Sequence, residues 1–458
     1  MIFTPETAIL ALGPDSFDPV AAADFPQTLL RFRNDRAAAQ IGLDGLDDDQ
    51  WCRHFGRFAP LSGSLPQPLA LRYHGHQFRT YNPDLGDGRG FLFAQCRDES
   101  GRLMDLGTKG SGTTPFSRLG DGRLTLKGAV REILATEMLE ALGVATSRTF
   151  SVIETGEKLA RSDEPSPTRS AVLVRLNHSH IRYGSFQARA FHQNRDGLTR
   201  LVDYCLTQLA PEASGPTPVA ALVDHAVKGA ARMAAQFMAA GFVHGVLNTD
   251  NINITGESFD YGPWRFAPAW DAGFTAAYFD HHGLYAFGRQ AEALQWNLYQ
   301  LGNALRLIAE VDELKGPLET YPQRYRAALS DAILGRLGVQ RLGSAEDEAL
   351  VAAIQKALVA TQMDPDRFFF DWRGGVRRAA SPAEHHYSHD GFTDFLALIP
   401  DFATGAPSHP YWSDEAPCTM LIDAVEALWT PIAERDDWAP LHAKVAAIRR
   451  MGDAHRAG

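Results

Sequence analysis

The order in which apolar patterns follow one another limits the possible folds of this chain more than any other feature of its sequence. Short apolar runs at 91–96 and 103–108 flank a polar turn and are typical of the two strands of a β-hairpin. Further strands are predicted at 149–154 and 170–175. After about residue 185 the apolar residues fall mostly at helical spacing. Strands first and helices later predict an α+β fold with two lobes.

Helical patterns occur in both parts of the chain. Residues 125–142 carry apolar side chains at helical spacing within the strand-rich part, and Gly143 is a suitable stop. An alanine-rich helix is predicted at 219–240, and another helix is expected near residues 25–41. Strand-like sequence follows around 242–254.

The length of 458 residues predicts two or three domains or lobes. We predict an N-terminal extension at 1–64 that packs on the core, a strand-rich lobe at 65–178, and a helical lobe with a C-terminal extension at 179–458. A hydrophobic content of 45% and a charged content of 22% are typical of a globular protein with a large core.

Composition and charge exclude several classes of function. The net charge of -11 argues against non-specific nucleic-acid binding, which needs clustered Lys and Arg. The N-terminus does not resemble a signal peptide, and no apolar run approaches the ~20 residues of a membrane helix, so a cytoplasmic protein is expected. The four cysteines have no C-x-x-C or zinc spacing, which favours reduced thiols. Nothing in the sequence demands an oligomer, so we expect a monomer.

Three modest signals in the strand-rich part are compatible with phosphate binding. The glycines of residues 86–90 let backbone N–H groups approach a phosphate, although a tight turn without a ligand explains them at least as well. Lys109 ends the returning strand and either reaches such a phosphate or lies exposed at a strand end. Glu132 falls on the next helix among small residues, where it either pairs with Lys109 or is an ordinary surface residue.

The segment 244–251 is the strongest local signal. Its polar residues lie between apolar flanks, and buried carboxylates and amides need a ligand, a metal or a partner. Asp260 follows Asn251 closely, and the two side chains can share a divalent cation because Mg²⁺ prefers hard oxygen ligands. The alternative for Asp260 is a capping residue before a turn.

Together these elements follow the order of the protein-kinase motifs: glycine loop, strand lysine, helix glutamate, catalytic loop and a final Asp-x-Gly. The kinase catalytic loop reads H-R-D-x-x-x-x-N. His244 and Asn251 keep that spacing, but Val246 holds the position of the catalytic Asp, and an acid appears instead at Asp250. The sequence therefore predicts a protein-kinase-like fold that does not position a hydroxyl for γ-phosphate transfer in the ordinary way.

Several longer motifs carry a resemblance to a known family across roughly residues 65–300. They lie at 73–78, 85–89, 109–118, 120–123, 131–132, 179–186, 248–251 and 260–263. With these motifs the chain resembles the selenoprotein O family (SelO, YdiU in bacteria), whose members are protein adenylyltransferases with a pseudokinase fold.

The resemblance implies transfer of AMP from ATP to Ser, Thr or Tyr hydroxyls of proteins, with release of pyrophosphate. It implies Mg²⁺, with Mn²⁺ and UTP as further options, so that UMP transfer is a second possible reaction. It makes Asp250 the general base and Asn251 and Asp260 the metal ligands. It assigns nucleotide binding to Gly86, Gly88, Arg89, Lys109, Glu132, Asp121, Gly122, Arg175, Arg182 and Asp260.

The chain departs from the family pattern near its C-terminus, where no cysteine or selenocysteine motif occurs. Thr113 also stands where an Arg is common in the family, which leaves one positive charge fewer near Lys109. Two alternatives stay open at this point: a kinase-like phosphotransferase, against which Val246 argues, and a catalytically inactive nucleotide-binding pseudokinase.

Overall fold

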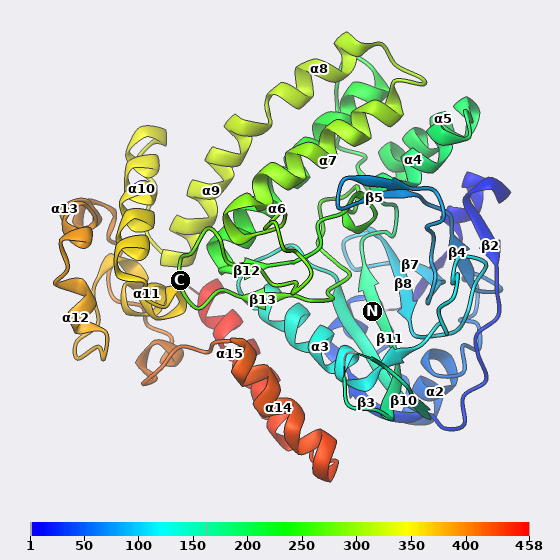
Figure 1. The fold of residues 1–458 in the computed structure, drawn as a ribbon, viewed down its shortest axis with the longest axis horizontal. Coiled ribbons are helices and arrows are strands. Elements are labelled where there is room, and N and C mark those ends of the chain that lie inside the picture. The colour runs from blue at the N-terminus through cyan, green and yellow to red at the C-terminus, as the bar shows by residue number, and fades with distance from the viewer. Residues whose placement is uncertain (1, 163, 458) are drawn as a thin grey trace.

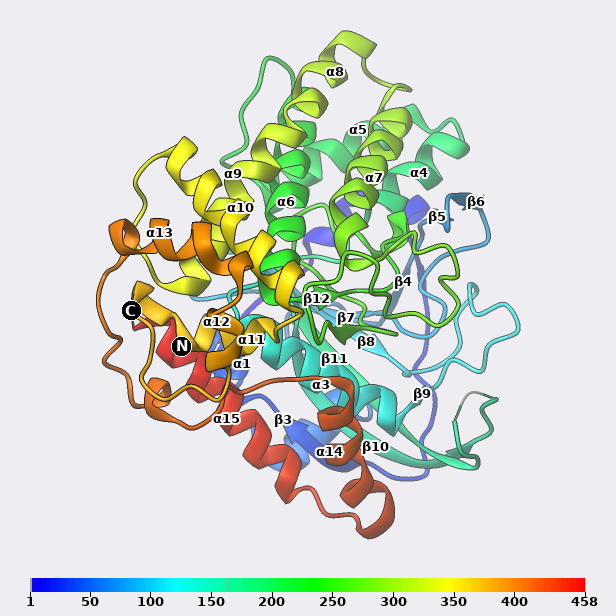
Figure 2. The same cartoon turned by 60° about the vertical axis from the view of Figure 1, so that its left-hand side comes forward.

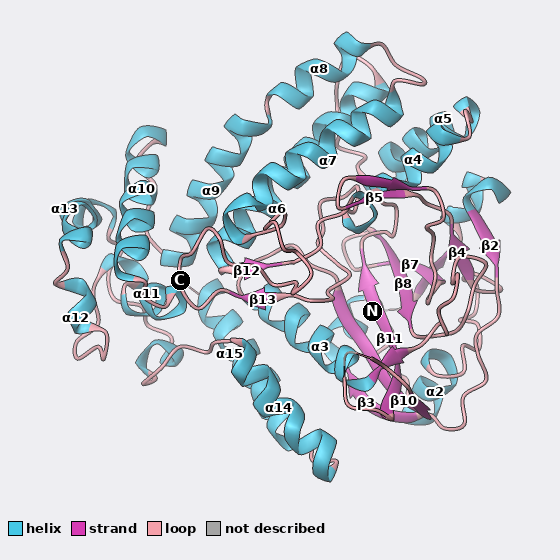
Figure 3. Cartoon of the chain, viewed as in Figure 1, coloured by secondary structure: helices cyan, strands magenta, loops and turns pink. Residues whose placement is uncertain are grey.

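The computed structural model describes residues 2–162 and 164–457, and within them one large antiparallel sheet lies on one side of the molecule with most helices on the other (Figure 1 and Figure 3). The strand order is β2-β4-β7-β8-β11-β10-β3, with β1 paired to β7 and β9 paired to β11. The strands of this sheet are β1 (Thr4–Glu6), β2 (Phe17–Pro19), β3 (Leu29–Arg33), β4 (Leu69–Leu71), β7 (Leu92–Arg97), β8 (Leu103–Lys109), β9 (Leu124–Thr125), β10 (Arg148–Leu159) and β11 (Thr168–Asn177).

The centre of the sheet confirms the predicted strands. β7 pairs with β8, and β10 pairs with β11, as the apolar runs indicated. β8 lies between β7 and β11 and is buried along its whole length. This register places Lys109 opposite Leu173 and Gly107 opposite Arg175. Lys109 of β8 and Arg175 of β11 therefore lie close together on neighbouring strands.

Helix α3 (Leu126–Ala141) crosses the sheet and packs against β10 and β11. Thr125 begins the helix, because its side chain accepts a hydrogen bond from the Gly128 N–H and so satisfies a free donor of the first turn. The predicted helix is confirmed. Its residues are buried on nearly every side, which is typical of a helix enclosed between other elements.

The second half of the chain is mainly helical, as predicted. α6 (Pro218–Ala240) begins at the capping residue Thr217 and ends at Gly241, whose φ of 69° is a left-handed C-cap. Its many alanines let neighbouring helices pack closely against it. The other α-helices between residues 183 and 402 are α4 (Tyr183–Phe191), α5 (Arg195–Tyr204), α7 (Gln290–Leu305), α8 (Val311–Glu319), α9 (Tyr321–Leu337), α10 (Ser344–Thr361), α11 (Pro365–Asp371), α12 (Glu384–Tyr387) and α13 (Thr393–Phe402).

Buried apolar side chains form three clusters in the described part of the chain. The largest runs from the sheet through α3 into α6 and α7, so the strand-rich and helical parts share one core. A second cluster lies under α9 to α13. The third includes residues of α1 (Asp35–Gln40) and α2 (Asp48–Phe55), where Trp51 of α2 stacks on Phe150 of β10 with ring centroids 4.8 Å apart.

The N-terminal region differs from the sequence-based expectation. The predicted helix near 25–41 is wrong, because Leu29–Arg33 forms strand β3 and only Asp35–Gln40 is helical. Pairing of β3 with β10 outweighs the local helical pattern. The helix α1 begins only after Asn34, whose side chain accepts a hydrogen bond from the Ala37 N–H. β1, β2 and β3 all join the large sheet. The proposed division at residues 64 and 178 stays a prediction.

The strand expected around 242–254 is also much shorter than predicted. Only β12 (Phe242–Val243) is a strand, paired with β13 (Arg265–Phe266), and Thr249–Asn251 forms a short 3₁₀ turn. A small hairpin of β5 (Gly75–Gln77) and β6 (Thr80–Asn82) packs against this turn and α4.

Helices α14 (Ile422–Arg435) and α15 (Ala439–Arg456) return to the strand-rich part and pack on α3, as Figure 1 and Figure 2 both show. α3 is therefore held between the sheet and the C-terminal helices. Among the residues that the structure describes, no helix is long and apolar enough to cross a membrane.

Candidate active site

A pocket of about 700 Å³ opens between the glycine turn, the ends of β8 and β11, and the loops that follow α6. Nearly all the predicted site residues line it, although they are up to 174 positions apart in the chain. These are Gly86, Gly88, Arg89, Lys109, Asp121, Gly122, Arg175, Arg182, Asp250, Asn251 and Asp260. Glu132 does not line the pocket but lies behind Lys109.

The predicted pair of Lys109 and Glu132 is present. Lys109 Nζ donates to Glu132 Oε2 over 2.7 Å, and both side chains are buried. In protein kinases the lysine of the third strand and the glutamate of the following helix form the same kind of pair. With the glycine turn and the loop of Asn251 in corresponding order, the α+β, protein-kinase-like arrangement is confirmed.

Asp260 is the centre of the positive charges in the pocket. Arg175 Nη1 donates to one carboxylate oxygen and Arg182 Nη1 to the other, each over 3.0 Å, while Lys109 Nζ lies 3.2 Å away. The Arg175, Lys109 and Arg182 charges hold the pKa of Asp260 well below its usual range, against the opposing effect of burial. Its backbone φ of 66° is left-handed, which Asp tolerates better than most residues.

Arg175 is itself held by a buried pair that the sequence did not single out. Its Nε donates to Nε2 of His180 over 3.1 Å. His180 Nδ1 lies 3.2 Å from Asp105, and the backbone N–H of His180 donates to the same carboxylate. Burial lowers the pKa of His180, so the ring is neutral and donates from Nδ1 to Asp105.

Asp250 lies in the 3₁₀ turn after α6, with 8% of its surface exposed. Among the described residues, its Oδ1 has no hydrogen-bond partner, and burial raises the pKa of its carboxyl to about 6. Gly75 packs directly against it, because a Cβ at that glycine would lie 2.7 Å from Oδ1. Arg182 donates to the Asp250 carbonyl over 2.8 Å and so ties this turn to the Asp260 cluster.

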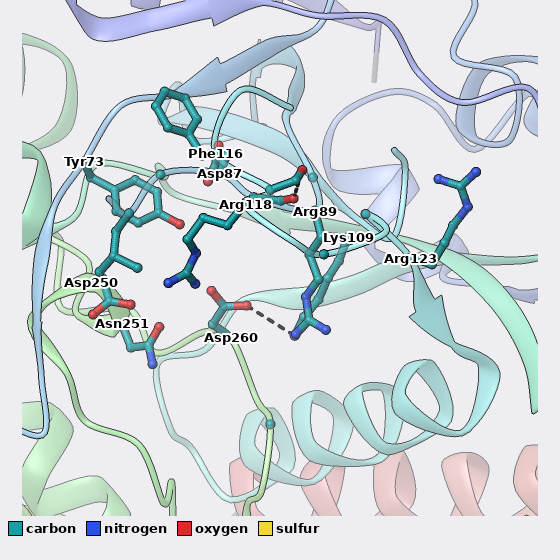
Figure 4. A pocket seen from close by; sticks show the side chains of 18 of the residues that line it. Tyr73, Asp87, Arg89, Lys109, Phe116, Arg118, Arg123, Asp250, Asn251 and Asp260 are labelled. Atoms are coloured by element: carbon teal, nitrogen blue, oxygen red, sulfur yellow. Dashed lines mark hydrogen bonds and ion pairs between the residues drawn. The ribbon is translucent and has the colours of Figure 1, made fainter. Parts of the chain in front are cut away.

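Asn251 follows in the same turn and also lines the pocket. Its Nδ2 donates to the Val246 carbonyl over 3.0 Å, which leaves its amide oxygen for another partner. Figure 4 shows Asp250, Asn251 and Asp260 along one side of the pocket, with Arg118 extending toward them from the loop beside the glycine turn.

The glycines of residues 86–90 let other groups approach the backbone closely. In the structure the group that lies against Gly86 and Gly88 is Phe116. A Cβ at Gly86 would lie 2.3 Å from the Phe116 ring, and one at Gly88 would lie 2.9 Å from the Phe116 carbonyl. Thr114 Oγ1 donates to the Asp87 carbonyl, and Ser117 Oγ donates to the Gly88 carbonyl. The turn and the 113–119 loop therefore form one wall of the pocket.

Asp121, which is exposed, and Gly122, which is buried, line the pocket between β8 and β9. Asp121 pairs with Arg161 over 2.8 Å, and this pair lowers the pKa of its carboxyl although burial opposes it. Gly122 has a φ of 70°, and a Cβ there would lie 2.3 Å from the Gly112 backbone. Other lining residues received no role from the sequence; among them are Tyr73, Phe116 and Arg118, which stand in quoted motifs, and Arg161, which does not.

Comparison with known proteins identifies relatives over almost the whole chain. The protein nucleotidyltransferase YdiU of Gloeobacter violaceus is 43% identical over 461 residues, which cover 97% of this chain and 95% of the relative. YdiU of a Synechocystis species is 42% identical over 470 residues, covering 97% and 98%.

A search of solved structures finds ROP2 from Toxoplasma gondii, described as a virulence factor with a protein-kinase fold and no enzymatic activity. The match covers 74% of this chain and 84% of ROP2 with 12% identity, and its TM-score of 0.27 is too low for any conclusion about this chain.

A family model described as protein adenylyltransferase SelO matches residues 2–392. That span includes every residue that lines the pocket and both members of the Lys109 and Glu132 pair. The chain therefore belongs to the SelO family of protein adenylyltransferases.

Proposed function

We propose that this protein transfers AMP from ATP to the hydroxyl of a Ser, Thr or Tyr residue in a protein substrate. The observation that carries the proposal is Asp250, a nearly buried carboxylate whose Oδ1 has no hydrogen-bond partner among the described residues. Val246 occupies the position of the kinase base, so we assign the role of base to Asp250, which lines the same pocket.

The positive side chains around Asp260 suit the triphosphate of ATP. Lys109, Arg175 and Arg182 are held in place by buried contacts, so little reorganisation is needed when an anion arrives. The backbone N–H groups of Gly86 and Gly88 and the side chain of Arg89 would supply further contacts from the glycine turn. Asp121 and Gly122 line the same pocket.

The donor set near the acids fits Mg²⁺, and it fits Mn²⁺ through the same oxygens. The amide oxygen of Asn251, which has no hydrogen-bond partner in the described part of the chain, and the Asp260 carboxylate are hard ligands. Mg²⁺ in nucleotide sites uses one or two carboxylates with phosphate oxygens. The ion would neutralise phosphate charge when bound. Asn251 and Asp260 would hold the ion, and the Lys109, Arg175 and Arg182 side chains that contact Asp260 would lie close to the phosphates.

The proposed step makes one bond and breaks one. The acceptor hydroxyl oxygen bonds to the α-phosphorus of ATP while the bond to the bridging oxygen breaks, and pyrophosphate leaves. Asp250 takes the hydroxyl proton, which requires it within hydrogen-bond reach of the acceptor. Its raised pKa of about 6 makes it a stronger base than an exposed Asp.

ATP labelled in the α- or the γ-phosphate separates this reaction from the alternatives. We expect α-label, and not γ-label, on protein after incubation with ATP and Mg²⁺, with an intact-mass gain of one AMP. Asp250→Asn should lose at least about 100-fold in rate, typical of a lost general base, while ATP binding persists. Asp280→Asn is the matched control, because Asp280 is equally buried but binds only backbone N–H groups.

Transfer of γ-label would indicate a phosphotransferase, and ATP binding without any transfer would indicate an inactive pseudokinase. Unchanged labelling by Asp250→Asn would remove Asp250 as the base.

A further inference from the structure

The β5–β6 hairpin has an unusual turn. Its two central residues, Phe78 and Arg79, have φ values of 48° and 64°. Two-residue turns with positive φ at both positions favour Asn-Gly, because a side chain with a Cβ is strained there. Strained backbone of this kind persists only where the surroundings enforce it, and it gathers at functional sites.

The surroundings that enforce this turn belong to the segment that carries Asp250. The His76 N–H donates to Thr249 Oγ1 over 2.7 Å, and the Phe78 N–H donates to Asn248 Oδ1 over 3.0 Å. Gly75, at the start of the hairpin, is the residue packed against the Asp250 carboxylate. The hairpin is therefore fixed beside the acid that acts as base in the proposed reaction.

Three aromatic side chains form a partly exposed cluster at this hairpin. Phe78 is 36% exposed, Phe279 is 40% exposed and Tyr278 is 81% exposed. The ring centroids of Phe78 and Phe279 are 5.8 Å apart, and those of Tyr278 and Phe279 are 5.1 Å apart. Single exposed aromatics are common on proteins, whereas a contiguous apolar patch marks an interaction site.

The cluster, which we name the aromatic platform (Phe78, Tyr278 and Phe279), continues from the mouth of the active-site pocket. Gln77 lines that pocket and immediately precedes Phe78. Gly75 contacts Asp250, and three residues of extended strand span roughly 10 Å. A substrate segment with its hydroxyl at Asp250 can therefore place a side chain about three positions away on the platform.

We infer that the aromatic platform binds the acceptor segment of the protein substrate, through a large apolar side chain about three residues from the modified Ser, Thr or Tyr. This inference rests on the proposed AMP transfer. The platform supplies substrate selection beside a pocket whose other contacts recognise only nucleotide and hydroxyl.

The test uses the full-length protein, ATP labelled in the α-phosphate, Mg²⁺, and synthetic 13-residue peptides with a central Ser, Thr or Tyr. A large apolar residue or Ala is placed at each flanking position in turn. We expect wild-type protein to favour peptides with the apolar residue about three positions from the hydroxyl. Phe78→Ala and the double variant Tyr278→Ala/Phe279→Ala should raise the peptide KM at least tenfold, abolish that preference and leave ATP affinity unchanged.

Two further variants separate docking from a structural role. Phe78→Gly removes the ring but suits the positive φ, so its melting temperature should stay above that of Phe78→Ala although its peptide KM rises as much. Tyr299→Ala is the matched control, since Tyr299 is 44% exposed on α7 and lies outside the platform. It should leave the peptide KM unchanged.

Wild-type peptide preference that persists in the platform variants would overturn the inference, as would loss of ATP affinity in Phe78→Gly. If wild-type protein transfers no α-label to any peptide or protein, the proposed function itself fails, and that result is distinct from a defect confined to the platform variants.

Discussion

His180 links Arg175 to Asp105, a role that its neighbours in the sequence do not indicate. It accepts from Arg175 and donates to Asp105, so a neutral imidazole with a fixed tautomer aims the guanidinium at Asp260. Gly107 makes room for it, because a Cβ at that position would lie 2.1 Å from His180 Nε2. His180 thus positions Arg175, to which we assign phosphate binding, without lining the pocket.

Replacing His180 with Phe should raise the KM for ATP about tenfold or more, because a hydrogen bond to a charged group contributes roughly 1.5–3 kcal/mol. His180→Gln keeps an acceptor and should recover much of the affinity. Steady-state kinetics with varied ATP, together with melting curves, provide the check. A lower melting temperature with an unchanged KM would show that His180 only supports the fold.

At the scale of elements, the decisive contact joins α15 to α3. Arg449 donates to both oxygens of the buried Glu137 carboxylate, over 2.8 Å and 2.6 Å. A second pair, between Lys127 and Glu426, joins α3 to α14 over 2.8 Å. Glu132 lies on α3 five residues before Glu137, about 140° around the helix. One side of α3 therefore holds Lys109 through Glu132, and another side is fixed to α15 through Glu137.

Arg449→Met should destabilise the protein by about 3 kcal/mol, since it leaves Glu137 buried without its partner. It should also weaken ATP binding, because α3 then no longer fixes Glu132 against Lys109. Urea denaturation and ATP titration measure the two effects. Arg456→Met is the matched control, because Arg456 makes an exposed pair with Asp453 on the same helix. Normal ATP affinity in the Arg449 variant would refute the proposed link between the α15 contact and the position of Glu132.

At the scale of the whole molecule, buried histidines should make stability depend on pH. Burial lowers the pKa of His180 and His244 below 6.5. Below pH 6.5 the unfolded chain binds protons that the folded protein does not, so stability is lost as pH falls, by up to about 1.4 kcal/mol per pH unit for each histidine. Asp250, with its raised pKa of about 6, opposes this loss in part.

The melting temperature should therefore be lower at pH 5.5 than at pH 7.5. The difference should shrink in His180→Gln, which removes one of the titrating groups. Calorimetry at both pH values tests this, and an equal pH response of the two proteins would show that His180 does not contribute.

The sequence by itself determined the central strands β7, β8, β10 and β11, the helices α3 and α6, and eleven of the residues that line the pocket. These features have local signals: apolar period, a cap at Thr125, a glycine stop at Gly241 and motifs in kinase order. Lys109 and Glu132 were paired correctly because a strand end and the following helix are close in the chain.

Tertiary structure alone decided the features that depend on contacts between distant segments. Leu29–Arg33 is a strand because β10 pairs with it, although its own sequence favours a helix. The three cations around Asp260, the support of Arg175 by His180, the hairpin fixed beside Asp250 and the packing of α15 on α3 likewise join residues far apart in the chain. No local period records such contacts, because each depends on the packing of the whole molecule.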